Sequence, residues 1–318
     1  MKEKITSLLI VAMLYMVTST LQSQPLKWDG EEKKLEIGNK VTILEDANGI
    51  LTFEQARGDG YSKQYKPSES TNLILGYTLS VFWVKFSLDN SMAAPLLLEV
   101  TQAGLPDCDL YYKDDSNKTV CWQAGFNTEF KDRAVKSSFQ VFPLLTGQRD
   151  YYLRLTTNSG PIPLRIYTKP EYDEKTIYLK FVYGIYLGLM LFVFLSNMFF
   201  FFSMRQFLYL FNAIMVLIFI TYSAIVVDGF IVYFFNKVDM LFWYTIIPCF
   251  GVTLQTLYCL WFLEVKKYKP RVYKFTIWAV VIFFAWWIIE FFLPFPIKQP
   301  INTLHSLLCF FIMGHTLV

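Results

Sequence analysis

The second half of the chain contains five long stretches that are almost free of charged residues. They cover residues 181–204, 206–227, 240–263, 275–293 and 299–318. Only the fourth contains a charge, Glu290. About 20 helical residues are needed to cross the hydrocarbon core of a bilayer, so each stretch is long enough to span it. We therefore predict a transmembrane region of five helices in residues 176–318.

The charged residues are concentrated in the first half. Residues 24–175 hold 18 Lys and Arg and 21 Asp and Glu, against 9 and 4 in residues 176–318. This difference predicts a water-exposed domain followed by a lipid-embedded one. The net charge of the chain is only +3, and its positive excess lies in the apolar half, so no nucleic-acid partner is expected.

The N-terminus, residues 1–23, has the pattern of a secretory signal peptide. Lys2 and Lys4 precede an apolar run at 5–17, and small polar residues follow. The alternative is a short first membrane anchor, although the apolar run is shorter than the bilayer requires. Both interpretations place the domain that follows outside the cytoplasm.

Residues 24–175 have the pattern of short β-strands separated by turn residues. The run VFWVKFSL at 81–88 alternates, which places Phe82, Val84, Phe86 and Leu88 on one face of a strand, towards a core. The run YYLRLTT at 151–157 alternates in the same way, and Asn48-Gly49 indicates a hairpin within residues 40–54. No sustained helical period precedes Thr176. The fold class that we predict is an all-β, jelly-roll-like sandwich followed by an α-helical transmembrane bundle.

The faces turned away from this core carry two pairs of an aromatic residue and a cation. These are Trp83 with Lys85, and Tyr152 with Arg154. Aromatic planes stack on sugar rings, and cations bind carboxylates or phosphates, so the four residues are candidate ligand-binding residues. The alternative is that they pack under a loop or against the membrane region.

Cys108 and Cys121 lie on either side of turn residues at 114–117, which suggests a hairpin. A structural disulfide across that hairpin is one interpretation, since an exported domain permits oxidation. Two buried thiols on the core face are the other.

The connectors between the apolar stretches differ in charge. The bend at 264–274 carries five Lys or Arg residues and the connector at 203–206 carries one, Arg205. The connectors at 228–239 and 290–298 carry one lysine each. By the positive-inside rule the basic connectors are cytoplasmic, which agrees with an exported first domain. We predict a multi-pass protein of the bacterial inner membrane with its N-terminal domain outside.

A few polar residues interrupt the apolar stretches, among them Asn197, Asn212 and Gln255. Amides in lipid usually form hydrogen bonds between helices, and a ligand or signalling role is the alternative. Gly184 and Gly188 lie four residues apart and could form a helix-packing face.

Sequence motifs of common catalytic sites are absent from the chain, including HExxH, GxSxG and the phosphate-binding glycine loops. The only histidines are His305 and His315, in the last apolar stretch. We therefore expect no enzymatic activity, no catalytic residues, no metal site and no cofactor.

Several strings, taken in order, resemble the bacterial seven-transmembrane receptors with diverse intracellular signalling modules. They are LED at 44–46, FWVKFSLDN at 82–90, LPDCDLYY at 105–112, YYLRL at 151–155, GIYLGLMLFVFLSN at 184–197 and FLYLFN at 207–212. The resemblance implies an exported sensor domain that binds small ligands such as carbohydrates, a seven-helix membrane region and a cytoplasmic output module. This sequence has five predicted helices, so we expect either a fragment or a shortened receptor that uses a partner for output.

Two hypotheses on function follow. The first is a membrane sensor that binds an extracytoplasmic small molecule or sugar and transmits the signal through the helices to a cytoplasmic signalling partner. The second is a membrane-anchored carbohydrate-binding or adhesion module without signalling. A single helix would anchor such a module, so the repeated spans favour the sensor.

Overall fold

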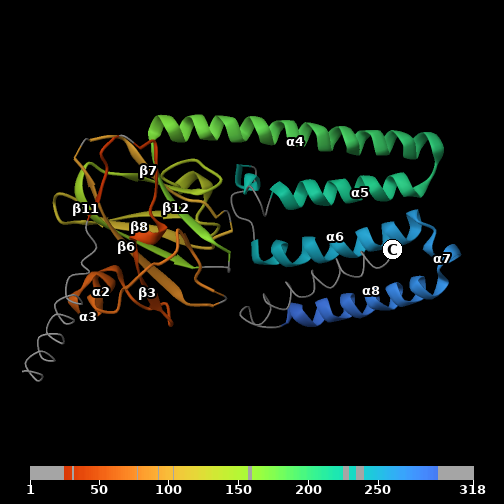
Figure 1. The fold of residues 1–318 in the computed structure, drawn as a ribbon, viewed down its shortest axis with the longest axis horizontal. Coiled ribbons are helices and arrows are strands. Elements are labelled where there is room, and N and C mark those ends of the chain that lie inside the picture. Colours follow the sequence, from red (N-terminus) through yellow and green to blue (C-terminus); the bar gives the residue numbers. More distant parts are fainter. Residues whose placement is uncertain are drawn as a thin grey trace, which may run out of the picture.

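A computed structural model describes residues 25–30, 32–76, 78–91, 93–102, 104–156, 160–224, 229–233 and 240–292. The described chain forms a β-rich part and a set of long helices that extend away from it (Figure 1). The predicted signal peptide, residues 1–23, and the fifth predicted helix, residues 299–318, lie outside the described residues.

The β-rich part consists of two sheets, as predicted. The larger sheet has the strand order β4-β3-β6-β11-β8-β9, and β1 pairs in parallel with β6. Its strands are β1 (Leu26–Lys27), β3 (Thr42–Asp46), β4 (Lys66–Pro67), β6 (Val81–Asn90), β8 (Cys108–Lys113), β9 (Thr119–Ala124) and β11 (Gly147–Thr156). The smaller sheet has the order β10-β7-β12-β2, and β5 pairs with β12. Its strands are β2 (Lys34–Glu36), β5 (Asn72–Leu73), β7 (Leu96–Val100), β10 (Gln140–Leu144) and β12 (Ile162–Thr168).

The main core lies between the inner faces of the two sheets. Phe82, Val84, Phe86 and Leu88 of β6 are all buried in it, which confirms the predicted alternation. β11 contributes Tyr151, Leu153 and Leu155 to the same core. The aromatic ring of Phe86 stacks on that of Tyr151 at a centroid distance of 5.3 Å.

The predicted hairpin at Asn48-Gly49 is wrong in its second half. β3 ends at Asp46, and Gly49 makes a turn with φ of +68°. The chain then forms helix α2 (Phe53–Arg57), because Thr52 caps it: Gln55 N donates to Thr52 Oγ1 and Thr52 N donates to Gln55 Oε1. A second short helix, α3 (Asp59–Ser62), follows. Helices therefore do occur before Thr176.

Four of the five predicted apolar stretches are helical in the described residues. The helices are α4 (Lys169–Met204), α5 (Phe207–Tyr222), α6 (Met240–Phe262) and α8 (Pro270–Phe291), with a short α7 (Val265–Tyr268) between the last two. α4 packs on α5, α5 on α6 and α6 on α8. Among the described residues α4 is the one helix long and apolar enough, by length and composition, to cross a membrane.

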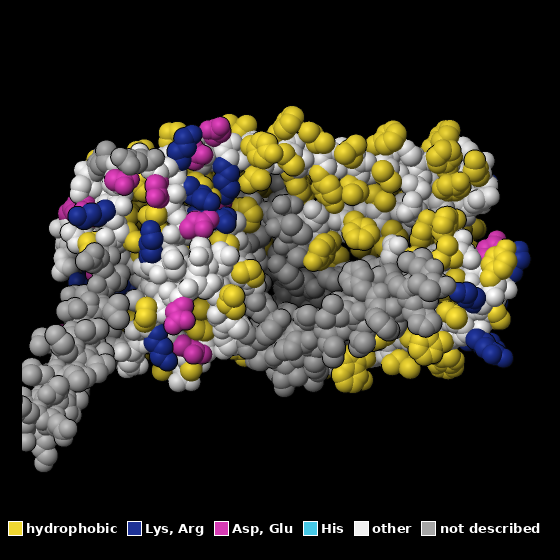
Figure 2. Space-filling view, in the orientation of Figure 1, with side chains coloured by type: hydrophobic (Ala, Val, Ile, Leu, Met, Phe, Trp, Pro, Cys, Tyr) yellow, Lys and Arg dark blue, Asp and Glu magenta, His cyan; other side chains and the backbone are white. Residues whose placement is uncertain are grey.

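Charged side chains gather at the two ends of the molecule. Figure 2 shows them over the sandwich and at the far end of the helices, while apolar side chains cover the helices between. The far end is the location of α7, with Lys266 and Lys267, opposite the sandwich (Figure 1). The basic bend and the β domain thus lie at opposite ends of the helical region.

Candidate functional site

The junction between the sandwich and α4 has no flexible linker. β12 ends at Thr168 and α4 begins at Lys169, so strand and helix are consecutive in the chain. Thr168 Oγ1 accepts a hydrogen bond from Glu171 N at 3.4 Å, and Pro170 occupies the first turn, where its missing N–H has no intrahelical partner to lose. The helix then continues for 36 residues. The first turns of α4 pack against the sandwich, and its last turns lie at the end of the bundle that is distant from the sandwich (Figure 1).

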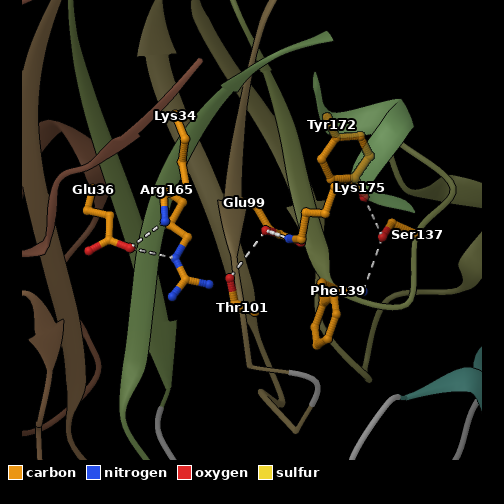
Figure 3. Close-up of polar contacts among 9 residues, drawn as sticks. All are labelled: Lys34, Glu36, Glu99, Thr101, Ser137, Phe139, Arg165, Tyr172 and Lys175. Carbon is orange, nitrogen blue, oxygen red and sulfur yellow. Dashed lines mark hydrogen bonds and ion pairs between the residues drawn. The ribbon is translucent and has the colours of Figure 1, made fainter. Parts of the chain in front are cut away.

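A buried ion pair joins α4 to the smaller sheet. Glu99 of β7 is only 1% exposed, and its carboxylate is bound by Lys175 Nζ of α4 (Figure 3). Thr101 Oγ1 donates to the same oxygen, Glu99 Oε2, at 3.3 Å. Lys175 Nζ also lies 4.8 Å from the centroid of the Tyr167 ring, a cation–π distance. Burial, with the charge of Glu99 adding to it, raises the pKa of Tyr167 to about 12.

A second polar contact lies one turn earlier on the same helix. Tyr172, which is buried, donates from its hydroxyl to Ser137 Oγ at 2.8 Å, and Phe139 N donates to the same oxygen at 3.3 Å. Tyr172 packs in a cluster with Leu97, Val141 and Tyr167 of the sheet. The start of α4 is therefore held by an ion pair, a hydrogen bond and an apolar cluster.

The sandwich also contacts the helical region through η4 (Phe230–Tyr233) and α6, in addition to its contacts with the start of α4. Phe126 and the nearby helix η2 (Phe130–Asp132) pack against Val232 and Tyr233 of η4. The rings of Phe130 and Tyr233 meet edge to face at 5.0 Å. Ile247 of α6 is buried in the same cluster. Two contacts fix the orientation of a rigid body better than one, so the sandwich and the bundle cannot turn independently about α4 without breaking this cluster.

Neighbouring helices in the bundle are joined by a hydrogen bond between amides. Asn212 Nδ2 of α5 donates to Asn197 Oδ1 of α4 at 3.0 Å. The contact joins two of the amides that the sequence indicated. Gln255 instead lies 3.6 Å from Cys259 Sγ within its own helix, α6. Gly184 and Gly188 do not form a close packing face among the described residues, because a Cβ at either position would meet no described atom within 4 Å.

The four candidate ligand-binding residues lie on the outer face of the larger sheet, with α2 over part of it. Trp83 and Tyr152 are 1% and 3% exposed, packed with Leu44, Phe53 and Ala56. Lys85 Nζ lies 3.8 Å from Asp150 Oδ2 and 5.4 Å from the centroid of the Tyr152 ring. These two aromatic faces are thus covered by neighbouring elements, the alternative raised above.

The fourth residue, Arg154, faces a carboxylate with a displaced pKa. Arg154 Nη1 lies 3.9 Å from Asp109 Oδ2. Burial raises the pKa of Asp109 to about 6, the Arg154 charge opposes this rise, and the Asp107 charge adds to it. Asp109 therefore changes its charge close to physiological pH.

The two cysteines of the β8–β9 hairpin are free thiols on opposite faces. The hairpin forms as predicted, but its register pairs Cys108 with Ala124 and Cys121 with Tyr111. The two cysteines are offset by three positions, about 10 Å along the strand, which exceeds the Cα separation that a disulfide tolerates. Cys108 is buried in the core and Cys121 is exposed, so neither proposed arrangement of the pair holds in this register.

Some residues of the junction were not singled out from the sequence. Glu99 stands in an otherwise apolar strand, LLLEV at 96–100, and such an isolated charge requires a buried partner. Thr168, Pro170 and Glu171 together form the signature of a helix start, and a hydropathy profile does not detect this signature. The described residues contain no group of three or more His, Cys, Asp or Glu placed to hold a metal ion.

A β-sandwich that leads directly into a long apolar helix, with basic residues at the opposite end of the helices, is the arrangement of a membrane protein with one domain outside the bilayer. Comparison with known families agrees. Residues 38–168 match the domain described as 7TMR-DISM extracellular 2, and residues 179–318 match the domain described as 7TM diverse intracellular signalling. The chain belongs to the family of seven-transmembrane receptors with diverse intracellular signalling modules.

Comparisons with individual proteins add little. No characterised protein matches the chain significantly. Among solved structures, a family 6 carbohydrate-binding module matches 31% of this chain and 82% of its own length, at 12% sequence identity and a TM-score of 0.17. A likeness at this level carries no argument about fold or ligand.

Proposed function

We propose that the chain is a multi-pass sensor of the bacterial inner membrane, whose external sandwich binds a small molecule and passes its state to the cytoplasmic side through α4. The observation that carries this proposal is the junction: α4 continues directly from β12 and is bound to β7 by the Glu99–Lys175 pair. A purely anchoring helix needs no such contacts. The membrane-anchored adhesion module is therefore the weaker hypothesis.

Transmission requires that the ligand bind two arrangements of the sandwich with different affinity. In the described part of the chain, two contacts connect the sandwich to the bundle, namely the start of α4 and the cluster of Phe126, Phe130 and Tyr233. A shift of one sheet relative to the other would move these contacts unequally and tilt α4 against α5 and α6. Cytoplasmic partners would bind to the bend that contains Lys266 and Lys267 and would respond there to the tilt of α4.

The ligand that we propose is polar and small, with carbohydrates as the leading class. The outer face of the larger sheet offers Lys85, Arg154 and Asp109 as hydrogen-bonding groups beside the aromatic rings of Trp83 and Tyr152. Stacking of a sugar on these rings requires α2 to move aside. We therefore expect ligand binding to change the environment of α2.

Hydrogen exchange on the full chain in lipid nanodiscs tests the coupling. The variant Glu99→Gln should change amide exchange at α7, at the far end of the bundle, because it loosens the start of α4. The matched control is Glu36→Gln, which removes a carboxylate of the same sheet that is paired with Lys34 and Arg165 and not with a residue of α4 (Figure 3). Identical exchange at α7 in wild type and Glu99→Gln would refute coupling through this junction.

A further inference from the structure

A cavity of about 490 Å³ lies at the corner where α4 leaves the sandwich. Its walls come from the smaller sheet and the segment before β10, from one face of α4, from the end of α5 and from η4. Pockets of roughly 300–1,000 Å³ hold small molecules in proteins, so this cavity is large enough for a ligand. It involves none of the four candidate ligand-binding residues of the sandwich.

The cavity is a long slot with a polar end and an apolar end. On α4 its lining extends from Tyr172 to Leu187, about 22 Å at 1.5 Å per helical residue. Glu99, Ser137 and Thr176 line the end beside the sandwich. Leu179, Val182 and Leu187 line the part that follows along α4. A molecule that matches this slot has a polar head and a hydrocarbon chain.

The charges around the polar end favour an anionic head. Lys175 neutralises Glu99, whereas Lys180, which also lines the cavity, has no carboxylate within 4 Å among the described residues. Lys180 lies instead over the Tyr233 ring at 5.7 Å from its centroid. The carboxylates of Glu171 and Asp173 at the helix start are already paired with Lys33 and Lys169. Among the described residues that line the cavity, Lys180 is thus the cation without a carboxylate partner.

We infer that this slot binds a membrane lipid with an anionic headgroup, with one acyl chain along α4 and the head beside Lys180. A lipid is the occupant that fits because the apolar part of the slot belongs to the candidate membrane span. Such a lipid would fill the space between α4 and η4, and would therefore stabilise the arrangement in which η4 packs against the sandwich. Binding at this site does not depend on the proposed sensor function.

Two glycines of α4 provide a matched pair of variants. Gly184 lines the slot and Gly188, one turn further on, does not. A Cβ at either position meets no described atom within 4 Å, so a side chain can start from both positions without a clash at its first carbon. Gly184→Phe would occupy the slot, and Gly188→Phe would place the same side chain one turn further along the helix, at a position that does not line the slot.

The experiment uses the full chain in phosphatidylcholine vesicles that contain a trace of photoreactive phosphatidylglycerol, with photoreactive phosphatidylcholine as the zwitterionic comparison. Mass spectrometry maps the attached lipid. We expect phosphatidylglycerol to label residues 179–187 in wild type and in Gly188→Phe, and this labelling to be lost in Gly184→Phe. Lys180→Gln should lower the preference for the anionic probe about tenfold, since a charge-assisted hydrogen bond is lost, and Lys180→Arg should keep it.

Equal labelling of Gly184→Phe and wild type would mean ordinary lipid contact around α4 and would overturn the proposal. Equal labelling of wild type by the two probes would overturn the anionic headgroup. The readout is binding alone, so either failure leaves the sensor proposal to its own test by hydrogen exchange.

Discussion

The Glu99–Lys175 pair allows the most quantitative prediction. Glu99 is 1% exposed and the Lys175 side chain is 23% exposed. The carboxylate is therefore shielded from water and needs the lysine to compensate its charge, whereas the ammonium group retains access to water. Removing one partner of a buried pair destabilises a protein by about 3–5 kcal/mol. For Lys175→Met we expect about 3 kcal/mol, the low end, because water can enter where the lysine was.

The other variants of the pair should be milder. Glu99→Gln keeps an acceptor for Thr101 Oγ1 and lets Lys175 turn to solvent, so we expect about 1–2 kcal/mol. The double variant Glu99→Gln/Lys175→Met leaves no unpaired charge and should be more stable than Lys175→Met alone. That rescue is the signature of an ion pair rather than of lost packing.

Thermal unfolding of the full chain in detergent, followed by near-ultraviolet circular dichroism, measures these differences. About 3 kcal/mol corresponds to a fall in the midpoint of roughly 6–12 °C for a domain of about 150 residues, the size of the sandwich. The control is Lys34→Met, which breaks the exposed Lys34–Glu36 pair and should cost about 0–1 kcal/mol. If Lys175→Met is no more harmful than Lys34→Met, or the double variant shows no rescue, the reasoning is refuted.

Three further predictions concern other parts of the chain. Gly125→Ala should destabilise the sandwich by about 1–3 kcal/mol, because Gly125 has a φ of +106° and a Cβ there would lie 2.4 Å from Pro106 O. The control Gly60→Ala, with open space around the glycine, should leave the stability unchanged. The midpoints of thermal unfolding of the two variants measure the difference. A double-mutant cycle of Asn197→Val and Asn212→Leu, measured by unfolding in detergent, should give a coupling free energy of about 0.6 kcal/mol. A coupling of zero would show that the hydrogen bond between the two amides does not stabilise the bundle. The pKa of Asp109 is raised to about 6, so its contribution to the free energy of unfolding is complete below the ordinary pKa of 3.8 and is lost as the pH rises through about 6. Between pH 5 and 7 the wild type should therefore lose on the order of 1 kcal/mol of stability, and Asp109→Asn should not. Parallel profiles of stability against pH for the two proteins would contradict this.

Much of the fold could be predicted because hydrophobic periodicity reports directly on burial. The alternation in β6 and β11 identified their core faces, and the apolar stretches located four helices. A role of Asn197 and Asn212 in hydrogen bonds between helices was also predictable, since an amide in an apolar helix needs a partner, but the sequence did not indicate that they bond to each other.

The remaining features depend on information that periodicity does not contain. Strand register places Cys108 and Cys121 three positions apart, and no local pattern determines that offset. The helix after Asn48-Gly49 depends on the capping box of Thr52 and Gln55, which overrides the strand-like composition of the segment. Burial of Trp83 follows from the position of α2, a tertiary contact.

The membrane topology is the claim on which the sensor depends, and labelling of intact cells tests it. Lys118→Cys lies in the exposed β8–β9 turn of the sandwich and Lys267→Cys in the exposed basic bend. A membrane-impermeant maleimide should label Lys118→Cys above the parent chain in intact cells, and Lys267→Cys only after permeabilisation. Labelling of both positions in intact cells, or of neither, would place the two ends on the same side and contradict transmission across the membrane.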